Sequence, residues 1–206
     1  MAGWWVALPV PFLLMYADSW TWIIVANILL GVNQGLAWSS TVIMKVDIVG
    51  QKNRGLAMGI NEFAGYLSVG LASYLASSIA SKYGYAYFPF IPGLFFAVAG
   101  LLVSAFLIKD TTHFVHAESA VSKIALLKNV WKDTTWKHKN ISSVTLNGLV
   151  NNMNDAVVWG LLPVLLLQKN FSIQEIGIIA GIYPAVWGVM QLFTGKMGDV
   201  YCKKQI

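Results

Sequence analysis

The sequence predicts an all-α integral membrane protein, and two observations lead to this fold class. First, 57% of the residues are hydrophobic and only 11% are charged, whereas a soluble domain carries about 25% charged residues. Second, the apolar residues gather in long blocks that are separated by short polar gaps. Such blocks cross a membrane as helices, because backbone groups in lipid must form their hydrogen bonds within the segment.

The apolar blocks predict about six membrane helices. Each block after the first is long enough to cross a hydrocarbon layer of about 30 Å. The first block is short for a complete span, which needs about 20 residues, so we expect a helix whose beginning is missing. The blocks lie at about 2–16, 20–44, 55–80, 86–108, 141–168 and 174–194.

The basic residues predict the orientation of these helices. All of the 14 Lys and Arg residues except Lys82 and Lys169 lie in alternate gaps, at 45–54, 109–140 and 195–206. The positive-inside rule places these gaps in the cytoplasm. We therefore expect a multi-pass protein of the plasma or inner membrane with both visible termini in the cytoplasm. The same pattern explains the net positive charge without a nucleic-acid partner.

The long polar stretch 109–140 predicts a boundary between two helical bundles, over 1–108 and 141–206. One helical face of this linker is apolar and is flanked by lysines, which is typical of a helix on an anionic membrane surface. A solvated linker with some helical content is the alternative. The apolar face comprises Ala120, Ile124, Leu127 and Trp131, and the flanking residues are Lys123, Lys128 and Lys132.

The same linker holds all three histidines. His113 and His116 lie near Asp110 and Glu118, a set that can bind a metal weakly, but nothing indicates a rigid closed site. We therefore expect ordinary linker histidines, no metal and no cofactor. Nothing in the sequence resembles a nucleophile–histidine pair or a phosphate loop, so an enzyme is not expected.

Two acids, Glu62 and Asp155, lie deep in apolar blocks, where an isolated charge costs several kcal/mol. Asp155 is the stronger candidate for a substrate or coupling site. At 100° per residue, Asn147, Asn151, Asn154 and Asp155 occupy an arc of about 100° on one helix. This stripe predicts the lining of a wet cavity, and hydrogen bonding between helices is the alternative.

Glu62 lies nearer the cytoplasm, on a face of small residues that favours a packed partner helix. A structural role and a coupling role for Glu62 remain equally open. In block 20–44 the glycines and hydroxyl residues predict close packing, and Asn33 and Gln34 are its candidates for substrate contact. The small-residue face comprises Asn61, Gly65, Ser68 and Ala72, and the packing residues are Gly31, Gly35, Ser39, Ser40 and Thr41.

The segment from Gly195 to Lys204 predicts a tight cytoplasmic link between two helices, in which the aspartate caps the next helix. Its spacing resembles a signature of the major facilitator superfamily of secondary transporters, Gly-x-x-x-Asp-basic-x-Gly-basic-basic. Gly195, Asp199, Lys203 and Lys204 match this signature, whereas Val200 and Cys202 depart from it. Asp47 followed by Arg54-Gly55-Leu56-Ala57-Met58-Gly59 resembles the loop between helices four and five of that family.

The resemblance covers the whole chain and implies the central fragment of a twelve-helix bundle, from the end of helix three to the loop after helix eight. It implies transport of a small solute by alternating access, with a substrate site between two bundles and a cytoplasmic gate. The coupling ion, H⁺ or another, stays open. The implied gate residues are Gly195, Asp199, Lys203, Lys204, Asp47 and Arg54.

Two departures limit what the resemblance implies about substrate. No basic residue lies between Ala17 and Met44, and no glycine–proline pair lies in 55–80, so drug–proton antiport is not supported. Sugar-porter signatures are absent as well. The alternative is a self-contained six-helix pore or scaffold that acts by self-association. A reading frame that continues into four more apolar blocks would exclude this alternative.

Overall fold

The computed structural model describes residues 1–121, 129–202 and 204, with the backbone alone at 51 and 118–121. Every regular element in these ranges is a helix. The predicted all-α class is therefore confirmed. Lys123, Ile124, Leu127, Lys128 and Lys203, which carried sequence predictions, lie outside the described residues.

The chain divides into two compact units. One comprises Met1–His116 with Ser172–Ile206, and the other comprises Ala117–Phe171. This division differs from the predicted boundary, which groups 141–206 together. The difference arises because the last helix, α9 (Ile173–Val200), packs along α4 (Arg54–Tyr83) of the first unit.

Five helical segments of the described chain are long and apolar enough to cross a membrane. The first predicted block instead forms two short helices, α1 (Ala2–Ala7) and α2 (Pro9–Met15). Pro9 follows the break at once, since proline has no N–H to continue the helical bonds. The five segments are α3 (Trp20–Val49), α4, η2 (Phe88–Phe90) with α5 (Ile91–Phe106), α8 (Lys139–Gln168) and α9.

Two helices extend beyond their predicted ends. Helix α3 continues to Val49, so Lys45 and Asp47 lie in its last turns instead of in a loop. Helix α9 continues to Val200, so the predicted link that begins at Gly195 is helical over more than half of its length. Isolated glycines cost a helix only about 1 kcal/mol each, and packing against α4 offsets this cost.

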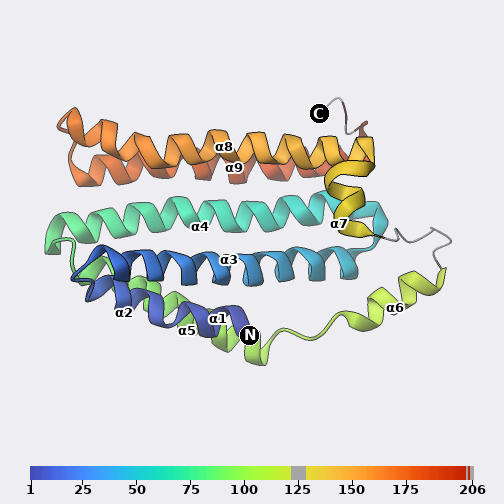
Figure 1. Ribbon diagram of the computed structural model, residues 1–206, viewed down its shortest axis with the longest axis horizontal. Helices are drawn as coiled ribbons and strands as arrows, with labels where there is room; N and C mark the ends of the chain where they lie inside the picture. The colour runs from blue at the N-terminus through green and yellow to red at the C-terminus, as the bar shows by residue number, and fades with distance from the viewer. Residues whose placement is uncertain (122–128, 203, 205–206) are drawn as a thin grey trace. The chain divides into compact units, whose positions relative to one another are not determined.

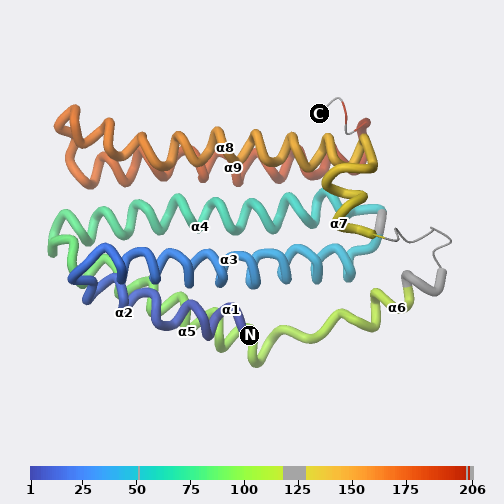
Figure 2. The backbone as a smooth tube through the Cα atoms, in the orientation of Figure 1, coloured from blue at the N-terminus to red at the C-terminus, as the bar shows by residue number. Residues whose placement is uncertain are grey.

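In the first unit α3 contacts α4 on one side and α1 and α2 on the other, and α5 contacts α1 and α2 (Figure 1). The backbone trace shows α1 and α2 following one nearly continuous course along α3 (Figure 2). Asn33 fixes this contact, because its buried Nδ2 donates a hydrogen bond of 3.0 Å to the carbonyl oxygen of Gly3. A side-chain amide thus joins two apolar helices where water is excluded.

The second unit contains α7 (Val130–Lys132), a π-helical turn at Asp133–Lys137 and α8. Helix α6 (Thr112–Val121) begins in the first unit and ends in the second. Trp131 is 81% exposed, but most of the apolar linker face predicted with it lies outside the described residues. The surface-helix interpretation therefore stays a prediction.

Candidate functional site

Helices α4 and α9 run antiparallel and approach each other closely along a line of glycines. We call this line the α4–α9 seam. Small residues at intervals of three, four or seven allow helix backbones to approach closely. The seam consists of Gly55, Gly59 and Gly70 on α4 with Gly177, Gly181, Gly188 and Gly195 on α9.

The seam has no room for larger side chains. A Cβ atom on Gly70 would lie 2.8 Å from the carbonyl oxygen of Gly181, and one on Gly181 would lie 2.9 Å from that of Gly70. A Cβ atom on Gly59 would overlap the carbonyl oxygen of Gln191. Each of these contacts is to a backbone atom, which cannot move away as the end of a flexible side chain can. The two helices therefore pack at this spacing only because these positions are glycine.

Asp199, near the end of α9, caps the beginning of α4. Its Oδ1 accepts a hydrogen bond of 2.7 Å from the Gly55 amide, and its Oδ2 accepts one of 2.9 Å from the Leu56 amide. The local N-cap residue, Asn53, provides no side-chain cap. The carboxylate thus bonds two amides that have no partner within their own helix, and it faces the positive end of the helix dipole.

This contact places the start of α4, which follows the basic segment 45–54, beside the end of α9. The charge pattern predicts the same arrangement, since 45–54 and 195–206 are both basic gaps. Sequence reasoning assigned the aspartate to the helix that follows it, but its bonded partner is α4. The cap joins residues that are 144 positions apart.

An acidic and aromatic cluster in the first unit extends from α3 across α4 to α9, and α4 contacts both of the other helices. The rings of Tyr66 and Trp187 stack at 4.1 Å between centroids, with an interplanar angle of 15°. The ring of Trp38 meets Tyr66 at 6.0 Å and 66°. Glu62 lies one turn from Tyr66 on α4, is half-buried, and accepts hydrogen bonds from the side chains of Asn61 and Trp38.

The two candidates on α3 have different surroundings. The side chain of Asn33 is held by Gly3, which gives it a packing role, whereas Gln34 is exposed and donates a hydrogen bond of 3.4 Å to Asn33. Gly31 and Gly35, which we expected in close packing, have no described atom within 4 Å of a Cβ position. Gln34 lies one turn from Trp38, the side chain that α3 contributes to the cluster.

In the second unit, the predicted stripe lies on α8, which is helical over the whole range. Asn147, Asn151 and Asn154 are exposed, and Asp155 is 4% exposed. Asn151 Nδ2 donates to Asp155 Oδ2 at 3.5 Å. The helix thus brings amide groups and one carboxyl group together along its own surface.

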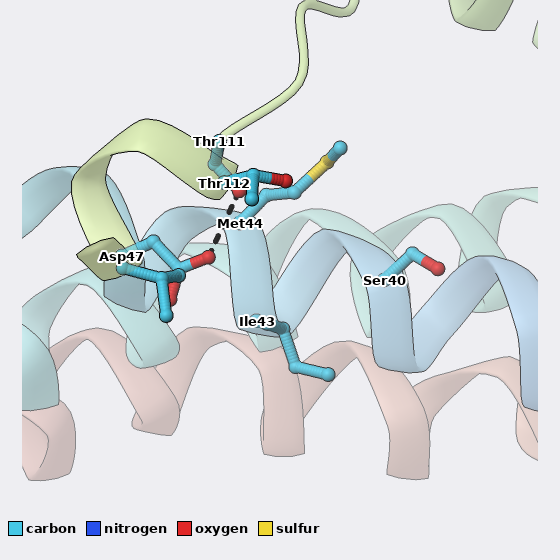
Figure 3. A pocket seen from close by; sticks show the side chains of 7 residues that line it. Ser40, Ile43, Met44, Asp47, Thr111 and Thr112 are labelled. Carbon is cyan, nitrogen blue, oxygen red and sulfur yellow. Dashed lines mark hydrogen bonds between the residues drawn. The ribbon is translucent and has the colours of Figure 1, made fainter. Parts of the chain in front are cut away.

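The other gate candidates in the described chain lie at the ends of α3, α4 and α9. Asp47 Oδ2 accepts a hydrogen bond of 2.8 Å from the hydroxyl of Thr111, beside a surface hollow between α3 and the start of α6 (Figure 3). Arg54 is the first residue of α4. Lys204 is exposed. Hydrogen bonds from the side chain and backbone of Thr112 hold the pKa of the nearby Asp110 below its usual value.

Comparison with known proteins identifies the family. The Major Facilitator Superfamily profile matches residues 1–206. The chain belongs to the major facilitator superfamily. Searches of curated proteins and of solved structures gave no significant match. Family membership makes the chain part of a membrane transporter with an all-helical bundle.

Sequence reasoning missed the seam of this family member, although a signal was present. Gly55 and Gly59, and likewise Gly177 and Gly181, are four residues apart, which is the small-xxx-small spacing of close helix pairs. It also missed Trp38, Tyr66 and Trp187. Aromatic residues are common in apolar blocks, so the sequence does not mark these three rings as a cluster.

Proposed function

We propose that the chain is the central part of a twelve-helix secondary transporter that moves a small solute by alternating access. In this proposal α4 and α9 are helices five and eight, one from each bundle, and the α4–α9 seam is a contact between the bundles. The observation that carries the proposal is the Asp199 cap on α4. A carboxylate that closes one end by bonding a helix terminus across an interface is a contact that can break and re-form.

The chemistry of this cap suits a gate. Each bond from a backbone amide to the carboxylate is charge-assisted, and removal of an N-cap costs about 0.5–2 kcal/mol. A contact of this size is strong enough to bias two states and weak enough to open in each cycle. Since both segments at this end are basic, we propose that the closed end is cytoplasmic.

Transport also needs a polar path through the membrane, which we assign to Glu62 and to the stripe on α8. Asn147, Asn151, Asn154 and Asp155 offer donors and acceptors along one face, as in the cavity of a transporter. Asp155 is the proposed substrate or proton site. Its carboxyl group is buried beside Asn151.

Alternating access predicts that the stripe is reached by water from both sides of the membrane. In the full-length protein with Cys202→Ser and any other cysteine replaced by serine, a single cysteine at Asn154 should react with a membrane-impermeant maleimide both in right-side-out and in inside-out vesicles. Leu149→Cys lies about 140° away on the same helix and should react from neither side. Reaction of Asn154→Cys from one side only, or from neither, would contradict the proposal.

The role of Asp155 predicts a change in pH dependence. In proteoliposomes, Asp155→Asn should reduce transport by the full-length protein at least about tenfold, the effect of losing about 1.4 kcal/mol of interaction, and remove its dependence on an imposed pH gradient. Asn152→Ala, whose amide bonds the carbonyl of Gly148 on its own helix, is the control and should transport normally. Undiminished, pH-dependent transport by Asp155→Asn removes Asp155 from the mechanism.

A further inference from the structure

We propose that Trp38, Glu62, Tyr66 and Trp187 form a binding site for a substrate that carries a positively charged nitrogen, such as an organic ammonium ion. The inference rests on the proposed transport function and names its substrate class. The site is built from three helices, since Trp38 lies on α3, Glu62 and Tyr66 on α4, and Trp187 on α9. These are the helices that meet at the α4–α9 seam and beside it.

Glycines in the helix backbones make room for these rings. A Cβ atom on Gly65 would overlap the six-membered ring of Trp38, so only glycine lets this indole lie on α4. A Cβ atom on Gly188 would lie 3.2 Å from the Cβ of Tyr66. Glycine thus stands at the points where the Trp38 ring and the Tyr66 side chain meet a neighbouring helix. The cluster is therefore a result of close helix packing at defined positions.

The aromatic rings of the cluster lie at defined angles to one another. Tyr66 and Trp187 stack almost in parallel, at 15°, and Trp38 is inclined at 66° to Tyr66. Tyr183, one turn from Trp187, adds a fourth ring at 5.8 Å. Aromatic rings are negative on their faces and positive at their edges, and the faces attract organic cations.

The cluster also contains one carboxylate, that of Glu62. Glu62 follows the same face of α4 as Tyr66 and accepts a hydrogen bond from the Trp38 side chain. Lys45 lies two turns beyond Trp38 on α3. Glu62 and Lys45 form no ion pair with each other within the described residues, and Glu62 accepts a hydrogen bond of 3.4 Å from the Asn61 side chain.

The charge of the surrounding helices favours a cation over an anion. The middle of α3, α4 and α9 carries no lysine or arginine, at 20–44, 55–81 and 173–195. A carboxylate in this low-dielectric setting repels an anionic solute and gains little from a neutral one. A cationic solute offsets the cost of the buried charge and also gains from the ring faces. The combination therefore selects for positive charge.

The test measures equilibrium binding to the purified full-length transporter, with tritiated tetraphenylphosphonium as the probe. Unlabelled tetraethylammonium and choline serve as competing cations, and 3,3-dimethylbutanol serves as the neutral match of choline. We expect saturable binding that the cations displace and the alcohol does not. Glu62→Gln should weaken binding at least about tenfold, because it removes an attraction of about 1.4 kcal/mol or more.

Matched variants distinguish the loss of an aromatic ring from general damage to the fold. Trp187→Phe keeps an aromatic face and should stay within about threefold of the wild type, whereas Trp187→Leu should weaken binding about tenfold. Asp18→Asn and Trp20→Leu, which change a charge and an indole at the beginning of α3 outside the cluster, should bind normally. Equal displacement by choline and 3,3-dimethylbutanol, no effect of Glu62→Gln, or no saturable binding of any cation overturns the inference.

These outcomes are distinct from failure of the transport function. Two-sided labelling of Asn154→Cys depends on access and on no property of the substrate. If labelling occurs from both sides while cations do not bind, the protein is a transporter of another substrate class. If cations bind at Glu62 while labelling is one-sided, the site exists but alternating access is wrong.

Discussion

Gly59→Leu in the full-length protein is expected to abolish transport while leaving membrane insertion intact. A Cβ atom at this position already overlaps the carbonyl oxygen of Gln191, so the leucine side chain forces α4 and α9 apart. Overpacking of this kind costs about 1–3 kcal/mol, and here it acts directly on the proposed closed end. Uptake into proteoliposomes and thermal unfolding in detergent measure the two effects.

Two smaller substitutions, one on α4 and one on α9, test whether steric overlap at the seam causes the loss of transport. Gly59→Ala adds one methyl group at the overlap and should lower both transport and stability. Gly198→Ala, on α9, adds the same group where no described atom lies within 4 Å of a Cβ position. It should be neutral or stabilising by up to about 1 kcal/mol, since alanine is the better helix former. Equal behaviour of the two variants would mean that the seam is not tightly packed.

Asp199→Ala is expected to open the end of the helix pair that Asp199 closes. The substitution removes both acceptors from the Gly55 and Leu56 amides and the charge that faces the start of α4. The loss of a cap of about 1–2 kcal/mol shifts an equilibrium about 5- to 30-fold. The direct readout is hydrogen exchange of a peptide that covers residues 52–60, which should become faster in the variant.

Asp110→Ala is the matched control for this exchange experiment. Asp110 bonds the backbone amide and the hydroxyl of Thr112 at the start of α6. Its loss should change exchange near Thr112 and leave 52–60 unaffected. Unchanged exchange of 52–60 in Asp199→Ala would show that water or another group serves these amides equally well.

The positions of the membrane helices were predictable because hydropathy is a local property. Each apolar block carries its own signal, and five of the six predicted blocks are long apolar helices in the described chain. The end of α9 was not predictable in the same way. Single glycines in Gly195–Val200 suggest a turn, but the helix persists because Gly195 packs against Gly55 and Gly59 of α4.

The candidate site was predictable only where the signal lay on a single helix. The stripe that includes Asp155 follows from residue spacing alone. The partner of Asp199 does not follow from residue spacing. A helix cap supplied by a distant helix produces no local sequence signal at the end of either helix. The partner of Asn33 was not predictable either, because a carboxamide in an apolar block can bind a solute or the backbone of a neighbouring helix. Its actual partner, Gly3, is 30 positions away.

The central claim is that α4 and α9 separate at the Asp199 end during transport, and the distance between these helix ends tests it most directly. Spin labels can be attached at cysteines placed at Met58 on α4 and Met197 on α9, which are 36% and 40% exposed, in the full-length protein with Cys202→Ser and any other cysteine replaced by serine. Double electron–electron resonance should give two distance populations, and Asp199→Ala should enlarge the longer one. A single short distance that Asp199→Ala leaves unchanged would contradict the account.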